Sequence, residues 1–270
     1  MTKKSGRGDI HGHFSTVAGV YRDVRTTDEE PIRVIRGALA GRAAIRGADI
    51  GCGAGRYDYL LFRHLPDLHL TCIDMNPEML AELSRHLRGN GIENFETLVA
   101  SVEDLQLIDQ SLDCIFSFNA VHHFDFPTFL NKIGGTMKKD GRTFVYTRTP
   151  GQNSRSIWGK HFPDFCEKER RLFKLETMKR WIDATERLTL IDARTFRYPR
   201  TASLRRLLEQ ARSKHYSTFS LYRPGEFDAA CETFADNIRR HFDDPMKVEW
   251  HDENILLQMA PDDNRKSRTR

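Results

Sequence analysis

Short apolar segments alternate with segments of helical character along the first 150 residues of this chain. The apolar segments are rich in Ile, Val, Phe and Thr, which favour strands, and they read GADIG, LHLTCID, FETLVAS, LDCIFSFN and RTFVYTRT. Helical spacing marks DEEPIRVIRGALAG, PEMLAELSRHLRGNG and FPTFLNKIGGTMKKDG, and the Asn90-Gly91 and Asp140-Gly141 pairs are expected to end the last two helices. Strands that alternate with helices predict an α/β fold with a mostly parallel sheet.

The pattern changes after Pro150. Residues 151–174 are aromatic and basic and have no clear period, which indicates a cap added to the sheet. Beyond this segment, periodicity predicts helices at 175–184, 201–215 and 224–242 and strands at 187–199 and 247–260. The sheet is therefore expected to receive its last strand late in the chain.

Composition narrows the class of protein. With 39% hydrophobic and 30% charged residues, the 270-residue chain is typical of a soluble enzyme with one α/β domain and an appendage. No apolar run is long enough to span a membrane, and the basic N-terminus is not followed by the apolar region of a secretory signal, so we expect a cytoplasmic protein. The five cysteines contain no CxxC pair, and no disulfide framework or metal site is expected.

A glycine-rich turn follows the first predicted strand. Gly51, Gly53 and Gly55 give the spacing GxGxG, where dinucleotide enzymes use GxGxxG to admit a pyrophosphate. Asp49, two residues ahead of the first glycine, would repel a diphosphate and suits a ligand that carries an ammonium or sulfonium charge. The turn therefore predicts a cationic nucleoside ligand and disfavours a nicotinamide oxidoreductase.

The second predicted strand ends in Asp74. An acidic side chain at this place can accept hydrogen bonds from both hydroxyls of a ribose. The alternative is that Asp74 only caps the helix that starts at Pro77. Combined with the glycine turn, the ribose interpretation is favoured.

Three segments of the chain resemble the class I S-adenosylmethionine-dependent methyltransferases of types 11 and 25. The segments are ADIGCGAGRY, TCIDMNPEML and SVEDLQLIDQSLDCIFSFNAVHHF. The resembled group is related to trans-aconitate and ubiquinone/menaquinone-pathway methyltransferases. The resemblance covers roughly residues 14–150. It implies a Rossmann-like, seven-stranded, mostly parallel sheet with an antiparallel last strand, helices on both faces and a helical cap or lid. The implied cofactor is S-adenosyl-L-methionine, with S-adenosyl-L-homocysteine as product.

The resemblance also implies the roles of individual residues. The turn from Gly51 to Gly55, with Cys52, would hold the methionine part of the cofactor, and Asp49 would lie near its amino group. Asp74, with Met75 beside it, would bind the ribose. The upstream segment HFSTVAGVYRDVRTTDEEP resembles one that folds over the cofactor, which makes Tyr21 a cover and Arg25 a partner for the methionine carboxylate; the alternative is a packing aromatic and a solvated charge.

Adenine recognition departs from the resembled pattern. Family members often carry an aspartate that contacts the adenine amino group, followed by a residue whose backbone N–H contacts the ring. The matching positions here are Ser101 and Val102, so the carboxylate is absent. Ser101 or Glu103 could replace it, and the backbone contact at Val102 does not depend on its side chain.

The resemblance predicts domains that we place as follows: a flexible N-terminal tail at 1–13, the S-adenosylmethionine-binding core at 14–150, the rest of the sheet with the cap at 151–260, and a flexible basic tail at 261–270. The cap itself is expected at about 149–175 and 199–244 and would select the methyl acceptor.

Methyl transfer is an in-line displacement at an activated carbon, so an enzyme mainly supplies alignment and exclusion of water. FNAVHHFD, after the fourth strand, places Asn119, His122 and His123 at the carboxyl edge of the sheet, where open α/β folds bind ligands. Asn119 is expected to line the transfer channel, and a histidine could take an acceptor's proton. A purely structural role of the two histidines stays open.

Arginines and aromatic residues recur in the cap, and two interpretations follow. They could form a pocket for a small anionic or aromatic acceptor, or a surface that holds RNA phosphates and stacks bases on Trp158, Phe162, Phe165, Tyr216, Phe219 and Tyr222. A third interpretation is that most of the arginines are solvated beside acidic neighbours. We favour a small-molecule acceptor and no membrane partner; the alternatives are an RNA or tRNA methyltransferase and a non-catalytic S-adenosylmethionine-binding regulator.

Overall fold

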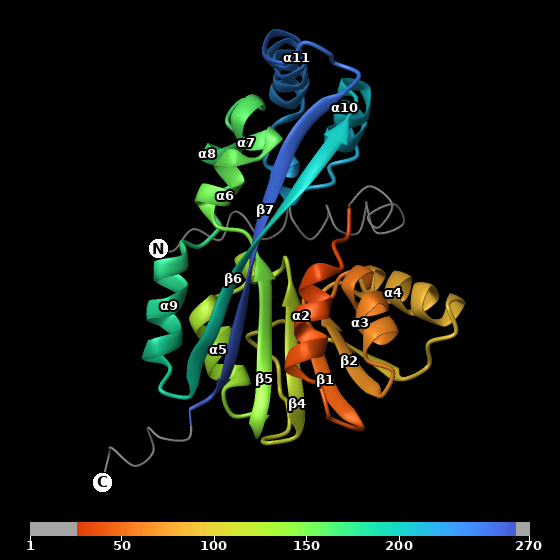
Figure 1. Ribbon diagram of the computed structural model, residues 1–270, viewed down its shortest axis with the longest axis vertical. Helices are drawn as coiled ribbons and strands as arrows, with labels where there is room; N and C mark the ends of the chain where they lie inside the picture. The colour runs from red at the N-terminus through yellow and green to blue at the C-terminus, as the bar shows by residue number, and fades with distance from the viewer. Residues whose placement is uncertain (1–25, 263–270) are drawn as a thin grey trace. The chain divides into compact units, whose positions relative to one another are not determined.

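The computed structural model describes residues 26–262 (Figure 1). The described chain divides into two compact units. The sheet unit consists of residues 27–147, 173–196 and 255–262, and the helical unit consists of residues 148–172 and 197–254. The tail predicted at 1–13 and most of the one predicted at 261–270 lie outside the described residues.

A seven-stranded sheet has the strand order β3-β2-β1-β4-β5-β7-β6. Its strands are β1 Ile45–Ile50, β2 Leu68–Asp74, β3 Phe95–Val99, β4 Leu112–Phe118, β5 Met137–Thr147, β6 Leu188–Ala202 and β7 Val248–Pro261. The pairs β3-β2, β2-β1, β1-β4 and β4-β5 are parallel, whereas β5 and β7 are antiparallel. The predicted mostly parallel sheet with an antiparallel last strand is therefore confirmed.

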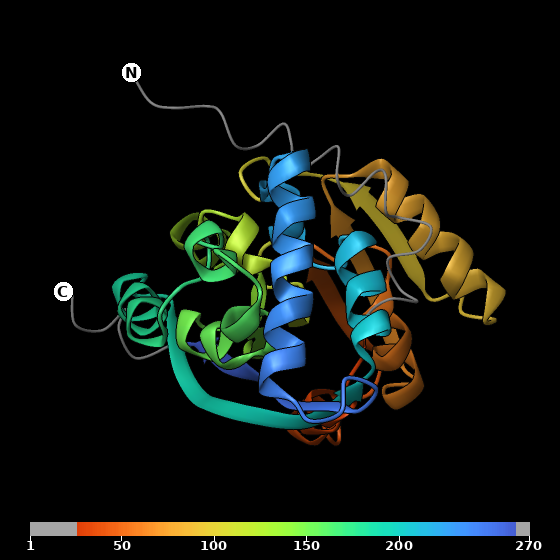
Figure 2. The same cartoon turned by 90° about the horizontal axis from the view of Figure 1, so that it is seen from above.

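Helices cover both faces of the sheet within the sheet unit. They are α2 Glu30–Ala38, α3 Arg56–His64, α4 Pro77–Gly89, α5 Phe126–Ile133 and α9 Leu175–Ala184, with the short 3₁₀ helix η1 Val121–His123. Helices α2, α3 and α4 pack on one face, and α5 and α9 pack on the other. In Figure 2, α4 lies along the edge strand β3, with which it is in contact.

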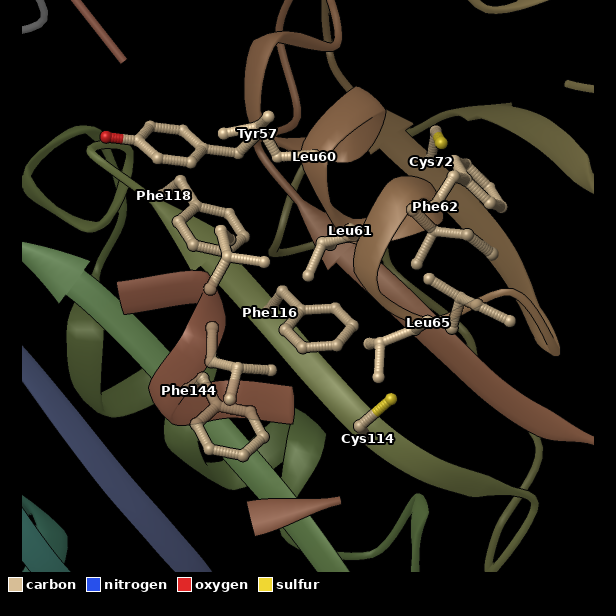
Figure 3. Close-up of a cluster of buried hydrophobic side chains, with 14 of the residues drawn as sticks. Tyr57, Leu60, Leu61, Phe62, Leu65, Cys72, Cys114, Phe116, Phe118 and Phe144 are labelled. Carbon is tan, nitrogen blue, oxygen red and sulfur yellow. The ribbon is translucent and has the colours of Figure 1, made fainter. Parts of the chain in front are cut away.

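The central strand β4 belongs to two cores because its side chains alternate between the two faces. Phe116 and Phe118 join the core beneath α2, α3 and α4, while Ile115 joins the core beneath α5 and α9. Figure 3 shows the first of these cores, where Leu61 of α3 lies over Phe116. The rings of Tyr57 and Phe118 stack in parallel with centroids 4.4 Å apart. Such a strand reads as one continuous apolar run, as LDCIFSF does.

Helix α4 shows why several boundaries could be predicted. Asn76 caps its N-terminus by accepting a hydrogen bond from the Met79 N–H, and Pro77 occupies the first turn, where no N–H is needed. Gly91 follows the helix with a φ of +75°, a conformation that glycine adopts without strain. The end predicted at Asn90-Gly91 is confirmed.

The helix end predicted at Asp140-Gly141 is wrong. Helix α5 ends at Ile133, before the Gly134-Gly135 pair, and β5 already begins at Met137. The register between β4 and β5 jumps from Leu112↔Met137 to Cys114↔Arg142, so residues 138–141 bulge out of the ladder. Gly141 therefore lies in a β-bulge. Glycine is common both in bulges and at helix ends, which explains the wrong prediction.

The helical unit carries its own core. Its helices are α6 Pro150–Arg155, α7 Ile157–His161, α8 Phe165–Lys168, α10 Leu204–Arg212, η2 Ser217–Leu221 and α11 Pro224–His241. Residues 151–174 show no period in sequence because they fold as three helices of 6, 5 and 4 residues. Trp158, Phe162, Phe165 and Phe219 are buried in this core together with Phe234 of α11.

Candidate functional site

The glycine turn connects β1 to α3 at the carboxyl edge of the sheet. Gly51, Gly53 and Gly55 all have positive φ, at 78°, 56° and 77°. A Cβ on Gly51 would lie 2.5 Å from the Ala120 Cβ and 2.7 Å from the Phe124 Cζ, so no other residue fits there. The same contact places the turn against the segment after β4 that carries the predicted catalytic residues.

Gly53 faces open space. A Cβ at this position would meet no described atom within 4 Å, in contrast to Gly51. Its N–H donates to the Asp74 Oδ2 at 2.9 Å, and the Asp74 Oδ1 accepts from the Asn76 N–H at 2.9 Å. Asp74 thus joins the turn to the end of β2, and because Asn76 caps α4, the alternative that Asp74 is only a helix cap is wrong.

Asp49 is the last but one residue of β1 and is 1% exposed. In the sheet it is paired with Cys72 of β2 and Phe116 of β4. Within the described chain, neither of its carboxyl oxygens accepts a hydrogen bond from an N–H or a hydroxyl group, and its neighbour is the carboxyl of Asp58, with which it can form a hydrogen bond only if one of the two is protonated. Burial, followed by the nearby charge of Asp58, raises the pKa of Asp49 well above the ordinary carboxyl value. A buried carboxyl without donors calls for a proton or a bound cation.

Asp58 was not identified from the sequence. It lies in α3, fully buried, and its Oδ1 accepts a weak hydrogen bond from the Cys72 thiol at a distance of 3.5 Å. Burial raises the pKa of Asp58 to about 7, although the thiol's hydrogen bond acts in the opposite direction. The sequence RYDYLLF contains a signal that Asp58 is buried. Asp58 is one residue from Tyr57 and three from Leu61, which places it on the core side of an amphipathic helix.

Cys52 and Met75 differ in surroundings. Cys52 is half-buried in the turn, and burial together with its neighbour Cys72 raises the pKa of its thiol, so it is not a reactive thiolate. Met75, directly after Asp74, is 54% exposed and lies at the carboxyl edge of the sheet. Its apolar side chain is available to a ligand.

The segment after β3 holds the residues predicted to recognise adenine. The Ser101 hydroxyl donates to the Asp104 Oδ2 at 2.7 Å, and the Asp104 N–H donates back to the Ser101 Oγ at 3.2 Å. Val102 is buried, while Glu103 is exposed. Sequence reasoning missed Asp104, whose carboxylate lies beside Ser101, where the resembled pattern has an acid.

Asn119, His122 and His123 follow β4 and are each half-buried. Asn119 has a φ of +54°, and its N–H donates to the Tyr146 carbonyl of β5 at 2.7 Å. The two imidazole rings of η1 lie 4.1 Å apart. The structure therefore brings these residues to the edge that carries the glycine turn, while Tyr21 and Arg25 lie outside the described residues.

Two kinds of site are not found in the part of the chain that the structure describes. No group of three or more His, Cys, Asp or Glu side chains could hold a metal ion. No helix there has the length and apolar composition needed to cross a membrane.

Part of the chain matches a known protein family. Residues 48–141 match the family described as "Methyltransferase domain". These residues form a methyltransferase domain. The match contains the glycine turn, Asp74 and the segment with Asn119 and the two histidines, and it bears out the resemblance to class I S-adenosylmethionine-dependent methyltransferases.

The relatives of this methyltransferase domain have varied names. The chain is 31% identical over 131 residues to the uncharacterized methyltransferase YcgJ of Bacillus subtilis, covering 48% of this chain and 51% of that protein. It is 26% identical over 144 residues to a malonyl-[acyl-carrier protein] O-methyltransferase of Alcanivorax borkumensis, covering 53% and 49%. The matches thus span about half the length of each curated relative.

Solved structures share the fold. The crystal structure of YcgJ has a TM-score of 0.59 at 18% identity, covering 86% of this chain and 98% of that one. Phosphoethanolamine N-methyltransferase 2 of Haemonchus contortus, in complex with S-adenosyl-L-methionine, has a TM-score of 0.59 at 16% identity, covering 96% and 59%. The Rossmann-like methyltransferase fold expected from the sequence is confirmed.

Proposed function

We propose that the chain is an S-adenosylmethionine-dependent methyltransferase that acts on a small anionic acceptor. The observation that carries the first part is the Asp49 carboxyl, which is buried directly below the glycine turn without a hydrogen-bond donor. A diphosphate would be repelled from this place, whereas an ammonium group supplies both the charge and the N–H donors that the carboxyl lacks. The open space at Gly53 fits a ligand that approaches the backbone closely.

The cofactor, when bound, supplies a methyl group on a sulfonium that an acceptor can displace in line. Asp49 would hold the amino group, and Asp74, fixed by the Gly53 N–H, would accept from the ribose hydroxyls. Asn119 would orient the acceptor at the edge of the sheet, and His122 or His123 would hold the proton that a protonated acceptor must lose. The residues thus bind, align and exclude water.

A cluster in the helical unit supports an anionic acceptor. The guanidinium groups of Arg148 and Arg200 share a single carboxylate, Asp252, at N–O distances of 3.9 Å and 3.3 Å. Arg148 also lies over the ring of Tyr216, with 5.3 Å between Cζ and the ring centroid. Guanidinium groups beside an aromatic ring are groups that can recognise a carboxylate or phosphate. The Alcanivorax relative is named for a malonyl group carried by an acyl-carrier protein, and such a malonyl group has a free carboxylate.

The RNA alternative loses much of its support. Of the six aromatic residues proposed to stack on bases, all except Tyr216 are buried in the core of the helical unit. Several of the arginines pair with carboxylates, as Arg155 does with Glu253 and Arg171 with Glu169. A base-stacking surface needs exposed rings.

Two measurements test the proposal. Calorimetry with S-adenosylhomocysteine should give binding in the micromolar range, and no binding in calorimetry would refute the cofactor assignment. Incubation with methyl-labelled S-adenosylmethionine and cell extract, followed by separation of small molecules, RNA and protein, identifies the acceptor. Label in small anionic molecules supports the proposal, label in RNA or free protein contradicts it, and cofactor binding without any labelled fraction favours the regulator.

A further inference from the structure

Two buried acids lie on the same face of the sheet. In β1, Gly47 and Asp49 are two residues apart and share a face, and a Cβ on Gly47 would lie 2.9 Å from the Cys114 Sγ and 3.2 Å from the Phe116 Cε2 of the core beneath α3. Asp58 of α3 accepts a hydrogen bond from the thiol of Cys72, and Cys72 is the residue of β2 that pairs with Asp49 in the sheet. Asp49 and Asp58 therefore meet where strand β2, strand β1 and helix α3 come together.

The surroundings of this pair do not favour two negative charges. The groups that act on it are Asp74 and Cys72 from β2 and Cys52 from the glycine turn, which are acids or thiols. Arg56 and Tyr57 begin the same helix, with the guanidinium stacked 4.8 Å over the Tyr57 ring. Burial makes both carboxylates costly to ionise. The charge of Asp58 further raises the pKa of Asp49, whereas a hydrogen bond from the protonated Asp49 lowers the pKa of Asp58, so the two carboxyls are suited to share one proton.

We propose that the Asp49-Asp58 pair carries one proton when no ligand is bound and releases it to solvent when a cationic group binds beside Asp49. This inference rests on the proposed function and deepens it, because it assigns Asp58 to the binding of the cofactor's ammonium. Asp58 is a positioning residue: it acts on the ligand only through Asp49. Apart from the proton that the pair can share, the buried carboxyl oxygens of Asp49 have no donor within the described chain, and this is the independent sign that the place receives a ligand.

The balance of charge and protons is simple. Before binding, one carboxyl of the pair is neutral and the other is an anion. The ligand enters with its ammonium already protonated, since amino groups of this kind hold their proton at neutral pH. Its N–H groups donate to Asp49, the positive charge favours ionisation of both carboxyls, and the proton of the pair passes to the buffer. No bond other than the O–H of the carboxyl breaks.

Linkage then fixes the pH dependence. The ligand prefers the pair without its proton, so acid competes with binding and the affinity rises with pH across the titration of the pair. The pKa of Asp58, which burial raises to about 7, places this competition near neutral pH, where an ordinary carboxyl would already be ionised.

Calorimetry of S-adenosylhomocysteine binding in buffers of different ionisation enthalpy counts the protons released. For the unmodified chain we expect the release of about one proton at pH 6 and of fewer protons as the pH rises. The variant Asp58→Asn keeps the size of the side chain and removes the second acid, so only burial and the more distant Asp74 then raise the pKa of Asp49, and proton release on binding should shift to lower pH. Asp67→Asn, at an exposed acid before β2, is the matched control and should behave like the unmodified chain.

The outcomes separate the two proposals. Binding by the unmodified chain without proton release at pH 6 overturns the role of Asp58 and leaves the proposed function intact. Equal proton release by Asp58→Asn also overturns it. If S-adenosylhomocysteine does not bind at all, the proposed function fails and this inference fails with it. The proton count of the unmodified chain decides the question even if Asp58→Asn does not fold.

Discussion

The Gly53 N–H and the Asp74 Oδ2 are joined by a hydrogen bond of 2.9 Å, although 20 residues separate them in the chain. This bond ties the glycine turn to the end of β2 and aims the second carboxyl oxygen of Asp74 along the strand end, where it accepts from Asn76. The turn and the carboxylate predicted to bind the ribose are thus one structural unit.

Replacing Asp74 by alanine should weaken S-adenosylhomocysteine binding strongly. The change removes the predicted ribose acceptor and the support of the Gly53 N–H at once. A hydrogen bond to a charged group contributes about 1.5–3 kcal/mol, so we expect the dissociation constant to rise at least tenfold. Calorimetry measures it, with Asp67→Asn as the control. Unchanged affinity would remove Asp74 from the site.

Alanine at Gly51 and at Gly53 should have different effects. At Gly51 the new methyl group overlaps Ala120 and Phe124, so the Gly51→Ala chain should be destabilised by several degrees in thermal unfolding. At Gly53 the methyl group meets no described atom within 4 Å. The cost of the substitution is then mainly the strain of a side chain at positive φ, about 1–2 kcal/mol. Gly53→Ala, and more so Gly53→Val, should therefore reduce ligand affinity more than stability. Equal effects of both alanine variants on stability would contradict this.

Stability of the ligand-free chain should depend on Asp58 and pH. Its pKa is raised to about 7, so between pH 4 and pH 7 the folded chain keeps a proton that the unfolded chain has lost. Stability therefore falls as the pH rises through this range, by at most about 4 kcal/mol from this group. Asp58→Asn should be more stable than the unmodified chain at pH 8, and this advantage should shrink below pH 5.

Urea unfolding at several pH values checks the last prediction. The free energy of unfolding should decline less with pH in the Asp58→Asn chain than in the unmodified chain, because one of two buried acids with a raised pKa is removed. A parallel decline in both chains would show that another group is responsible.

Arg148→Gln should reduce methyl transfer without changing cofactor binding. The change removes one of the two guanidinium groups that pair with Asp252 and so lowers the positive charge of the cluster by one. Less label should reach small anionic molecules, while the dissociation constant for S-adenosylhomocysteine stays the same. Arg155→Gln, which removes an exposed arginine that is paired with Glu253, is the control.

Much of the fold follows from the sequence because local signals and tertiary packing agree. Strand β2 and helix α9 have the bounds that their periodicity predicts, and Asn76 with Pro77 marks the start of α4. The end assigned to Gly141 failed because glycine permits both a helix end and a bulge, and only the partner strand decides between them.

The site could be predicted in part for the same reason. Asp49 and Asp74 are recognisable because fixed distances from the glycine turn define them, and the turn is a local structure. Asp58 could not be recognised, because a single acid in a helix usually faces solvent and its burial depends on contact with Cys72 of another element. The cap aromatics were interpreted as a surface because three very short helices give no periodicity from which burial could be read.

The contact of Gly51 with Ala120 and Phe124 also has a consequence for protein synthesis. The glycine turn emerges from the ribosome early, but its shape is supported by a segment that is made some 70 residues later, after β4 has paired with β1 (Figure 1). A nascent chain that ends before Phe124 therefore contains all three glycines of the turn but lacks the Phe124 side chain that packs against Gly51. The glycine turn therefore gains its complete set of neighbours only when translation has passed this point.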